Sequence, residues 1–303
     1  MVNVGAVIPS PLLPGMALPD VARLAREAEA AGLDGIWAED HLAAGDAFVL
    51  DPICVLAAAA GATEHIEIGS SIFVPSLRNI SWALKQVATL QLVAQGRLRL
   101  GVGLGGAGED EYKLAGVTRT GQRERTEEFL GILAAARRGE VDKVETPLSA
   151  RALLLGTALP APPLWVGGTS SAALRRAARF GDGWLSGLQT PGEFQASLNQ
   201  LRRLAEEEGR PCPMAGIVLH VAVGTATGGD LAAQSAAAMH SLYGVPPERA
   251  RELAIGGDPE QVADALGRYL DAGAAQFCVV SNVLPWSESW LMLAQVRRML
   301  SVT

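Results

Sequence analysis

Hydrophobic and polar residues follow a repeated order along the chain: an amphipathic helix, a glycine, a few residues and then a short apolar strand. Three stretches share this order, AREAEAAGLDGIWAED, LRRAARFGDGWLSG and LGRYLDAGAAQFCVVS. Before the strand of the first stretch, apolar residues recur with helical spacing from Val21 to Ala28, and Gly32 supplies a left-handed stop. Before the last, Asp258 and Gln261 have the spacing of a capping box. Each stretch is therefore predicted to be a helix that leads into a strand.

Five further runs have the pattern of strands: NVGAVIP, IEIGSSIFV, RLRLGVG, PLWVG and GIVLHVAVG. They are mostly continuous apolar runs, typical of parallel strands that are buried on both faces. With the three repeats, eight strands alternate with helices over 303 residues. This order favours a (β/α)8 TIM barrel over an open doubly wound sheet. We expect an α/β protein with a single domain over residues 1–303 and short insertions, of which Gly139–Pro163 is the least regular.

Composition excludes several classes of function. The formal net charge is -7 and no long basic run occurs, which argues against a nucleic-acid partner. No run of about 18 apolar residues occurs, so no membrane span is expected. Three cysteines, Cys54, Cys212 and Cys278, lack the spacing of a zinc site, and no metal site is predicted. A reducing cytoplasmic location is the simplest expectation.

Polar residues gather where predicted strands end, and in a TIM barrel these carboxyl ends carry the chemistry. The second strand ends in WAEDH, which brings Glu39, Asp40 and His41 to that face. Asp40 as an ordinary helix cap is one interpretation. A histidine beside an acid also suits acid–base work or a hydrogen bond to a ligand, and we favour this interpretation for His41 and Asp40.

Two glycine-rich stretches follow the fourth and fifth strands. GVGLGGAG contains Gly101, Gly103 and Gly105, and such runs mark places where backbone, ligand or another chain comes close. WVGGTSS places Gly167–Ser171 before a helix whose free amide groups attract an anion. This turn lacks the Walker lysine and is not GxGxxG, so a plain helix cap remains an alternative to a phosphate site.

The chain resembles the bacterial luciferase-like flavin oxidoreductases, which comprise FMN-dependent monooxygenases and deazaflavin (coenzyme F-420) dependent reductases and dehydrogenases. The resemblance lies in four blocks in the family's order: GIWAEDHL, IGSSIFVPSLRNISWALKQVATLQLVAQGRLRLGVGLG, PPLWVGGTSSAALRRAARFGDGWL and IGGDPEQVADALGRYLDAGAAQFCVV. Four ordered blocks are more specific than any one of them.

The resemblance implies a cofactor site across the top of the barrel. The ring would lie against the third and fourth strands, with a non-prolyl cis peptide at Ser71–Ile72 and with glycines that admit the ring. The phosphate would lie at the turn after the fifth strand. Asp40 and His41 would lie beside the reactive ring as the catalytic pair. The implied cofactor-binding residues are Asp40, Ser71, Ile72, Gly103, Gly105, Gly167, Gly168, Thr169, Ser170 and Ser171.

The resemblance leaves the activity open. A compact chain rich in alanine and arginine favours deazaflavin-dependent hydride transfer to or from a small-molecule substrate. The alternatives are an FMN-dependent monooxygenase, a flavin-binding barrel without turnover, and an unrelated phosphate-binding barrel such as a sugar-phosphate isomerase. Gly106 occupies the place of a catalytic glutamate in the sugar-phosphate dehydrogenase branch, so that activity is not expected; the acids nearest to it are Glu109, Asp110 and Glu111. The family commonly forms homodimers, and we expect one here.

Overall fold

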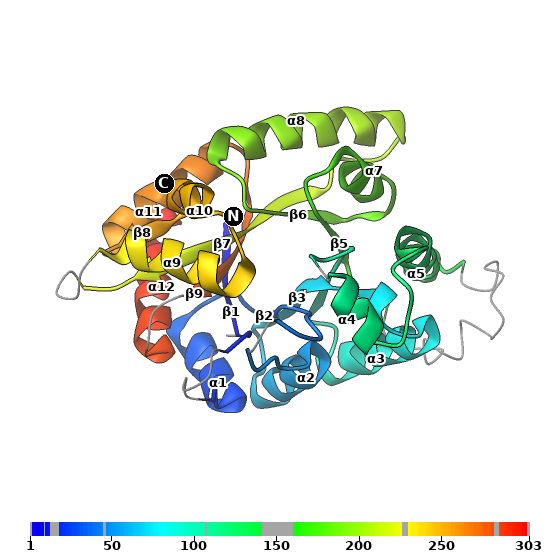
Figure 1. Ribbon diagram of the computed structural model, residues 1–303, viewed down its shortest axis with the longest axis horizontal. Helices are drawn as coiled ribbons and strands as arrows, with labels where there is room; N and C mark the ends of the chain where they lie inside the picture. Colours follow the sequence, from blue (N-terminus) through cyan, green and yellow to red (C-terminus); the bar gives the residue numbers. More distant parts are fainter. Residues whose placement is uncertain are drawn as a thin grey trace.

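Eight parallel strands close into a barrel in the computed structural model (Figure 1), which describes residues 2–8, 10–12, 18–44, 47–106, 108–140, 160–225, 230–281 and 285–301. The order is β6-β5-β4-β3-β2-β1-β9-β7, and pairing of β6 with β7 closes it. A short strand, β8 (Ile255–Gly257), pairs with the end of β7. The barrel strands are β1 (Asn3–Val7), β2 (Gly35–Ala38), β3 (Glu67–Phe73), β4 (Leu98–Val102), β5 (Leu164–Gly167), β6 (Gly183–Gly187), β7 (Met214–Val223) and β9 (Gln276–Ser281).

Helices surround the barrel; on one face of it α4 follows the end of β4, and α9 follows the end of β7 and leads into α10 (Figure 1). The helices are α1 (Val21–Ala31), α2 (Pro52–Ala62), α3 (Ile80–Val93), α4 (Glu109–Leu114), α5 (Gln122–Arg137), α7 (Ser171–Phe180), α8 (Pro191–Glu207), α9 (Leu231–Tyr243), α10 (Pro247–Leu253), α11 (Pro259–Asp271) and α12 (Trp286–Leu300), with a 3-10 turn, η1 (Pro75–Leu77).

Local sequence signals account for the ends of the predicted helices. Gly32 follows α1 in the left-handed conformation with φ 86°, as expected. Asp258 and Gln261 form the predicted capping box at the start of α11. Each of these signals satisfies backbone groups that a helix end leaves unpaired.

Two apolar layers hold the barrel together. The larger lies between the sheet and the helices, with residues such as Ile36, Leu100 and Leu266 fully buried. The smaller fills the barrel itself, where Trp37 and Trp165 meet edge to face with ring centroids 6.4 Å apart. Gly5, Gly69 and Gly183 make room for these rings: a Cβ at Gly69 would lie 2.3 Å from Trp37. The two rings thus fill the barrel interior at this level.

The structure confirms the predicted (β/α)8 barrel and all eight predicted strands. Trp286 and Trp290 of α12 are buried in the core. Most of the Gly139–Pro163 stretch lies outside the described residues, and the single domain over 1–303 stays a prediction. None of the helices in the described ranges has the length and apolar character needed to cross a bilayer.

Candidate active site

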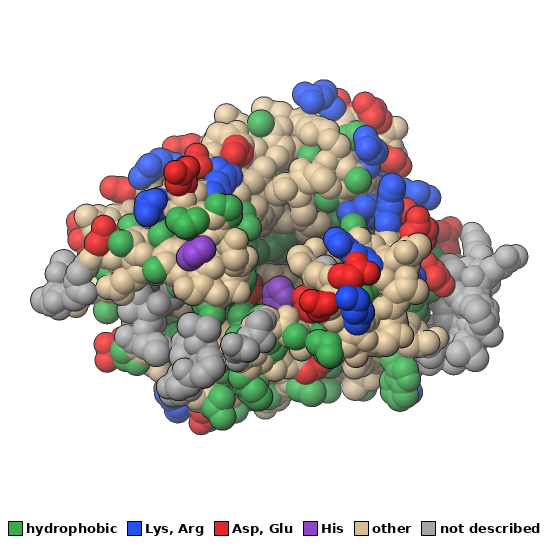
Figure 2. Space-filling model, viewed as in Figure 1, with side chains coloured by type: hydrophobic (Ala, Val, Ile, Leu, Met, Phe, Trp, Pro, Cys, Tyr) green, Lys and Arg blue, Asp and Glu red, His purple; other side chains and the backbone are tan. Residues whose placement is uncertain are grey.

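The mouth of the barrel is a hollow at the carboxyl ends of the strands. Figure 2 shows it between α9 on one side and α4 on the other, with a hydrophobic floor and a histidine flanked by acidic side chains. These helices follow β7 and β4, so the visible face is the one where TIM barrels carry their chemistry. The ends of β2, β3, β4 and β5 bring the predicted residues to this face.

His41 follows the end of β2 and therefore lies at this face of the barrel. Its side chain is 26% exposed, and its Nδ1 lies 3.9 Å from Oε1 of Glu111. The other oxygen of Glu111 accepts hydrogen bonds from the backbone N–H groups of Leu42, at 2.7 Å, and Ala43, at 3.4 Å. Glu111 comes from α4 and is itself largely buried. It therefore fixes the loop that carries His41 and lies beside the imidazole.

Asp40 has a different role from the one expected of it. Its carboxylate accepts two hydrogen bonds from the guanidinium of Arg78, including one of 2.9 Å, and one of 2.8 Å from the N–H of Val74. Its side chain is 1% exposed. Asp40 was expected to form a catalytic pair with His41, but its carboxylate is held by Arg78, and the acid beside His41 is Glu111. Contact of Asp40 with a bound cofactor stays a prediction.

Glu39, which the sequence placed at this face without a role of its own, is a buried acid. Its Oε2 accepts a hydrogen bond of 2.8 Å from the hydroxyl of Tyr243, at the end of α9. The Tyr243 ring packs against the His220 ring with centroids 4.7 Å apart. The pKa of Glu39 is raised to about 7 because burial, which raises it, outweighs the hydrogen bond from Tyr243, which lowers it. Burial beside Glu39 also raises the pKa of Tyr243 well above its ordinary value.

Ser71 and Ile72 lie at a bulge in β3, where the pairing with β4 shifts register between Ser70 and Phe73. The Ser71–Ile72 peptide bond is cis, as predicted. The Ser71 hydroxyl oxygen is buried and has no hydrogen-bond partner among the described residues. The bulge thus presents a free polar atom in the barrel wall.

The glycines of β4 are explained by this bulge. A Cβ at Gly101 would lie 2.0 Å from the carbonyl oxygen of Ser70, and one at Gly103 would lie 2.2 Å from Cδ1 of Ile72. Gly105 has a positive φ of 65°, which disfavours other residues. Close approach is therefore confirmed, but at Gly101 and Gly103 the approaching group is the protein's own β3. Contact of Gly103 and Gly105 with a cofactor stays a prediction.

The turn from Gly167 to Ser171 leads from β5 into α7. Thr169, Ser170 and Ser171 are exposed, and the Ser170 hydroxyl caps the helix by accepting a hydrogen bond from Ala173 N–H. Gly168 has φ 113°, so a side chain there would be strained whatever it contacts. The turn combines the helix cap and the accessible helix N-terminus that were weighed as alternatives.

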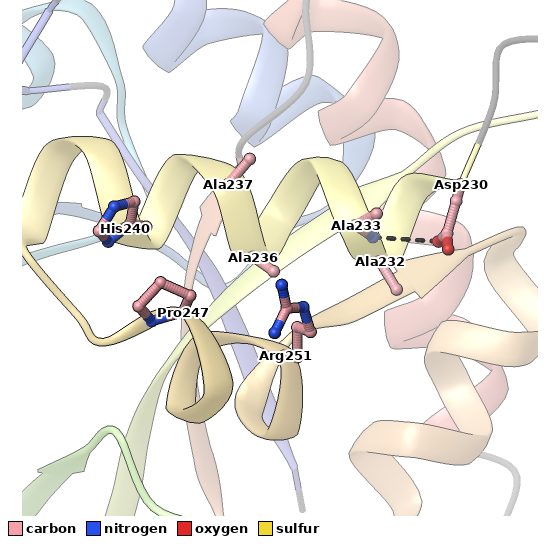
Figure 3. Close-up of a pocket in the computed structure, with 8 residues that line it drawn as sticks. All are labelled: Asp230, Ala232, Ala233, Ala236, Ala237, His240, Pro247 and Arg251. Atoms are coloured by element: carbon pink, nitrogen blue, oxygen red, sulfur yellow. Dashed lines mark hydrogen bonds between the residues drawn. The ribbon is translucent and has the colours of Figure 1, made fainter.

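A separate pocket of about 600 Å³ lies between α9 and α10 (Figure 3). Arg251 points from α10 toward α9, but the neighbouring polar groups serve the helix ends. Asp230 accepts a 3.0 Å hydrogen bond from Ala233 N–H, and His240 Nδ1 lies 3.0 Å from the Val245 carbonyl oxygen. No barrel strand contributes to this lining, so the mouth remains the candidate site. Within the described ranges, no group of three or more His, Cys, Asp or Glu residues could hold a metal ion.

Sequence reasoning located His41 and the β5 turn but missed Glu111 as the neighbour of His41 and Tyr243 as the partner of Glu39. The sequence contains three consecutive acids, Glu109, Asp110 and Glu111, but nothing in its pattern indicated that Glu111 is the one beside His41. Tyr243 lies 204 residues from Glu39. No local signal connects residues that far apart.

Comparisons with known proteins agree with this geometry. The family model described as luciferase-like monooxygenase matches residues 3–243. An F420-dependent secondary alcohol dehydrogenase in complex with an F420-acetone adduct has a TM-score of 0.78 at 18% identity, over 99% of each chain. A monooxygenase from Streptomyces bottropensis has a TM-score of 0.79 at 18% identity, also over 99% of each chain. At these identities the two structures establish the shared fold alone.

Curated relatives match part of the sequence. An uncharacterised protein of Mycobacterium tuberculosis is 32% identical over 172 residues, which are 52% of this chain and 56% of that protein. The F420-dependent glucose-6-phosphate dehydrogenase of Beutenbergia cavernae is 34% identical over 168 residues, 52% of this chain and 49% of that enzyme. The chain thus spans about half the length of the curated relatives it matches.

Proposed function

Because the chain belongs to the luciferase-like monooxygenase family, we propose that it is an oxidoreductase that uses the deazaflavin F-420 to transfer hydride to or from a small organic substrate. The observation that carries this proposal is the position of His41 at the mouth, partly exposed and beside Glu111, which binds the backbone of the loop after it. Membership in this family also removes the alternative of an unrelated phosphate-binding barrel. The expected homodimer and cytoplasmic location stay predictions.

The residues at the mouth fit a ring-shaped cofactor with a phosphate tail. The buried and unpartnered Ser71 hydroxyl offers a hydrogen bond in the β3 wall. The exposed turn from Thr169 to Ser171 offers backbone amides and hydroxyls to the phosphate. When bound, a deazaflavin accepts or gives up hydride, and the protein contributes orientation and electrostatics.

We propose that His41 exchanges a proton with a substrate oxygen or carbon during hydride transfer, or donates a hydrogen bond to the substrate oxygen. Glu111 restrains the loop after His41 through two backbone N–H groups and so limits the positions of the imidazole. Such positioning matters because acid–base groups act only within hydrogen-bond distance. Asp40, closed off by Arg78, has no place in this step.

An FMN-dependent monooxygenase is the second candidate. The Streptomyces bottropensis monooxygenase is as similar in structure as the secondary alcohol dehydrogenase is. A flavin-binding barrel without turnover is the third candidate. Titration of the purified protein with F-420 and with FMN in separate experiments, followed by visible absorption, tests all three. The proposal requires tight binding of F-420 and substrate-dependent bleaching or recovery of its absorption. Binding of FMN alone, or binding without turnover, would refute it.

The phosphate turn can be tested without a strained backbone. Ser171→Glu places a negative charge at the first position of α7, which favours the helix but repels a phosphate. We expect at least about tenfold weaker cofactor binding with no loss of stability. Ser171→Gln is the matched neutral control, and its affinity should remain within a few-fold. Equal affinities for the two variants would show that the phosphate lies elsewhere.

A further inference from the structure

Glu39 is a buried acid at the mouth. The side chains of β2 alternate, and Trp37, two residues before Glu39, fills the barrel interior. Glu39 therefore lies above Trp37 at the level of the mouth and is 9% exposed. Its Oε2 is bonded to Tyr243, and Oε1 has no hydrogen-bond partner among the described residues. One oxygen is thus anchored and the other is available.

Tyr243 is held on the opposite side of the mouth by its own small core. It packs on a cluster between α9 and α10 that includes Met239, Val245 and Leu253. Its ring also contacts His220, an inward residue of β7. The hydroxyl thus reaches Glu39 from a packed support. Three elements, β2, β7 and α9, fix the position of the Glu39 carboxyl.

The electrostatic surroundings of Glu39 contain no arginine or lysine partner among the described residues. Tyr243 from α9 bonds to Glu39 directly, and His220 lies behind the Tyr243 ring. His41 and Asp40 follow Glu39 in the chain, and Asp40 is already paired to Arg78. Without a cation, burial raises the pKa of Glu39 to about 7. A carboxyl with a pKa near the working pH is effective in both taking up and releasing a proton.

We propose that Glu39 is a second acid–base residue of the mouth and that Tyr243 is the residue that positions it. This inference rests on the proposed hydride transfer. In alcohol oxidation, the free oxygen of Glu39 would take the proton of the substrate O–H group, and a bound cofactor would be reduced by taking up the hydride of the neighbouring C–H bond. The products are a C=O group and a neutral Glu39. His41 donates a hydrogen bond to the same substrate oxygen, and reduction runs these transfers in reverse.

Steady-state pH profiles test the assignment. With wild-type protein, kcat for oxidation should rise with pH through a midpoint near 7. Glu39→Gln should lower kcat about a hundredfold, leave KM within a few-fold and abolish this rise. Tyr243→Phe should move the midpoint to higher pH, because the hydrogen bond it removes lowers the pKa of Glu39. Tyr269→Phe is the matched control: its hydroxyl donates to the Gln189 carbonyl, and its profile should equal that of the wild type.

A measurement on the cofactor-free protein separates the outcomes. In carboxyl carbon-13 NMR of protein labelled at glutamate, one resonance should titrate near pH 7, disappear in Glu39→Gln and titrate at higher pH in Tyr243→Phe. A Glu39 resonance that titrates near pH 4.5 would overturn the inference whatever the activity. Normal wild-type turnover with an unchanged profile in Glu39→Gln would also overturn it while leaving the proposed function intact. A wild-type protein inactive with both cofactors would refute the proposed function itself, and the inference with it.

Discussion

Replacement of Glu39 by glutamine should change how stability depends on pH. Burial raises the pKa of Glu39 from 4.5 to about 7 in the folded protein, whereas in the unfolded chain it returns to the ordinary value. Between these values the folded state binds more protons than the unfolded state. The free energy of unfolding therefore falls as pH rises from about 4.5 to about 7 and is level outside this window. Glutamine keeps the shape of the side chain and can accept the same hydrogen bond, but it does not ionise. The free energy of unfolding of the variant therefore lacks the fall that ionisation of Glu39 causes over this pH window.

The size of the effect follows from the difference in pKa. A difference of about 2.5, at about 1.36 kcal/mol for each pKa unit, corresponds to about 3 kcal/mol. Unfolding entropy is about 2.1 cal/mol/K per residue, or about 0.6 kcal/mol/K for a chain of 303 residues. The melting temperature of the variant should therefore equal that of the wild type near pH 4 and exceed it by about 5 °C at pH 8.

Thermal unfolding followed by circular dichroism, at one scan rate and at several pH values from 4 to 8, measures this difference. Comparison at each pH cancels the titration of groups that the substitution leaves undisturbed. Glu64→Gln is the control, because that side chain is 85% exposed and its substitution should give no such trend. In Tyr243→Phe, the pH range over which the free energy of unfolding falls should extend to higher pH, since the substitution removes the hydrogen bond that lowers the pKa of Glu39. A difference in melting temperature between Glu39→Gln and wild type that stays constant from pH 4 to pH 8 would refute the reasoning.

Three further outcomes are expected. Gly101→Ala should lower the melting temperature by several degrees or prevent folding, because its Cβ would lie 2.0 Å from a backbone oxygen of β3. Gly106→Ala is the control: a Cβ there would have nothing within 4 Å, so its melting temperature should be close to that of the wild type. His41→Ala should lower turnover about a hundredfold with cofactor affinity within a few-fold, while the 87% exposed His65→Ala should do neither; loss of affinity alone would make His41 a binding residue. Asp40→Asn should lower the free energy of unfolding by about 3 kcal/mol, measured by denaturant titration, because it removes the buried carboxylate that pairs with the partly buried Arg78 guanidinium; a change below about 1 kcal/mol would contradict the role given to this pair.

The fold was readable from the sequence because its signals are local. Helical spacing from Val21 to Ala28, the stop at Gly32 and continuous apolar runs each act within about ten residues, and their order along the chain leaves few topologies. The resemblance to a known family added the cis bond at Ser71–Ile72, which the structure contains. His41 was predicted at the mouth because a residue at the end of a barrel strand must lie there.

The pairing of charges was decided only by the tertiary structure. Asp40 stands next to His41 in the chain, but successive residues at a strand end point to opposite sides, and the Asp40 carboxylate turns to Arg78. Glu111 then takes the place beside His41 from a helix about seventy positions later. Glu39 meets Tyr243 across the barrel, 204 residues away. A sequence pattern fixes which side of an element a residue occupies; which partner it meets, and therefore its pKa, depends on how distant elements close around it.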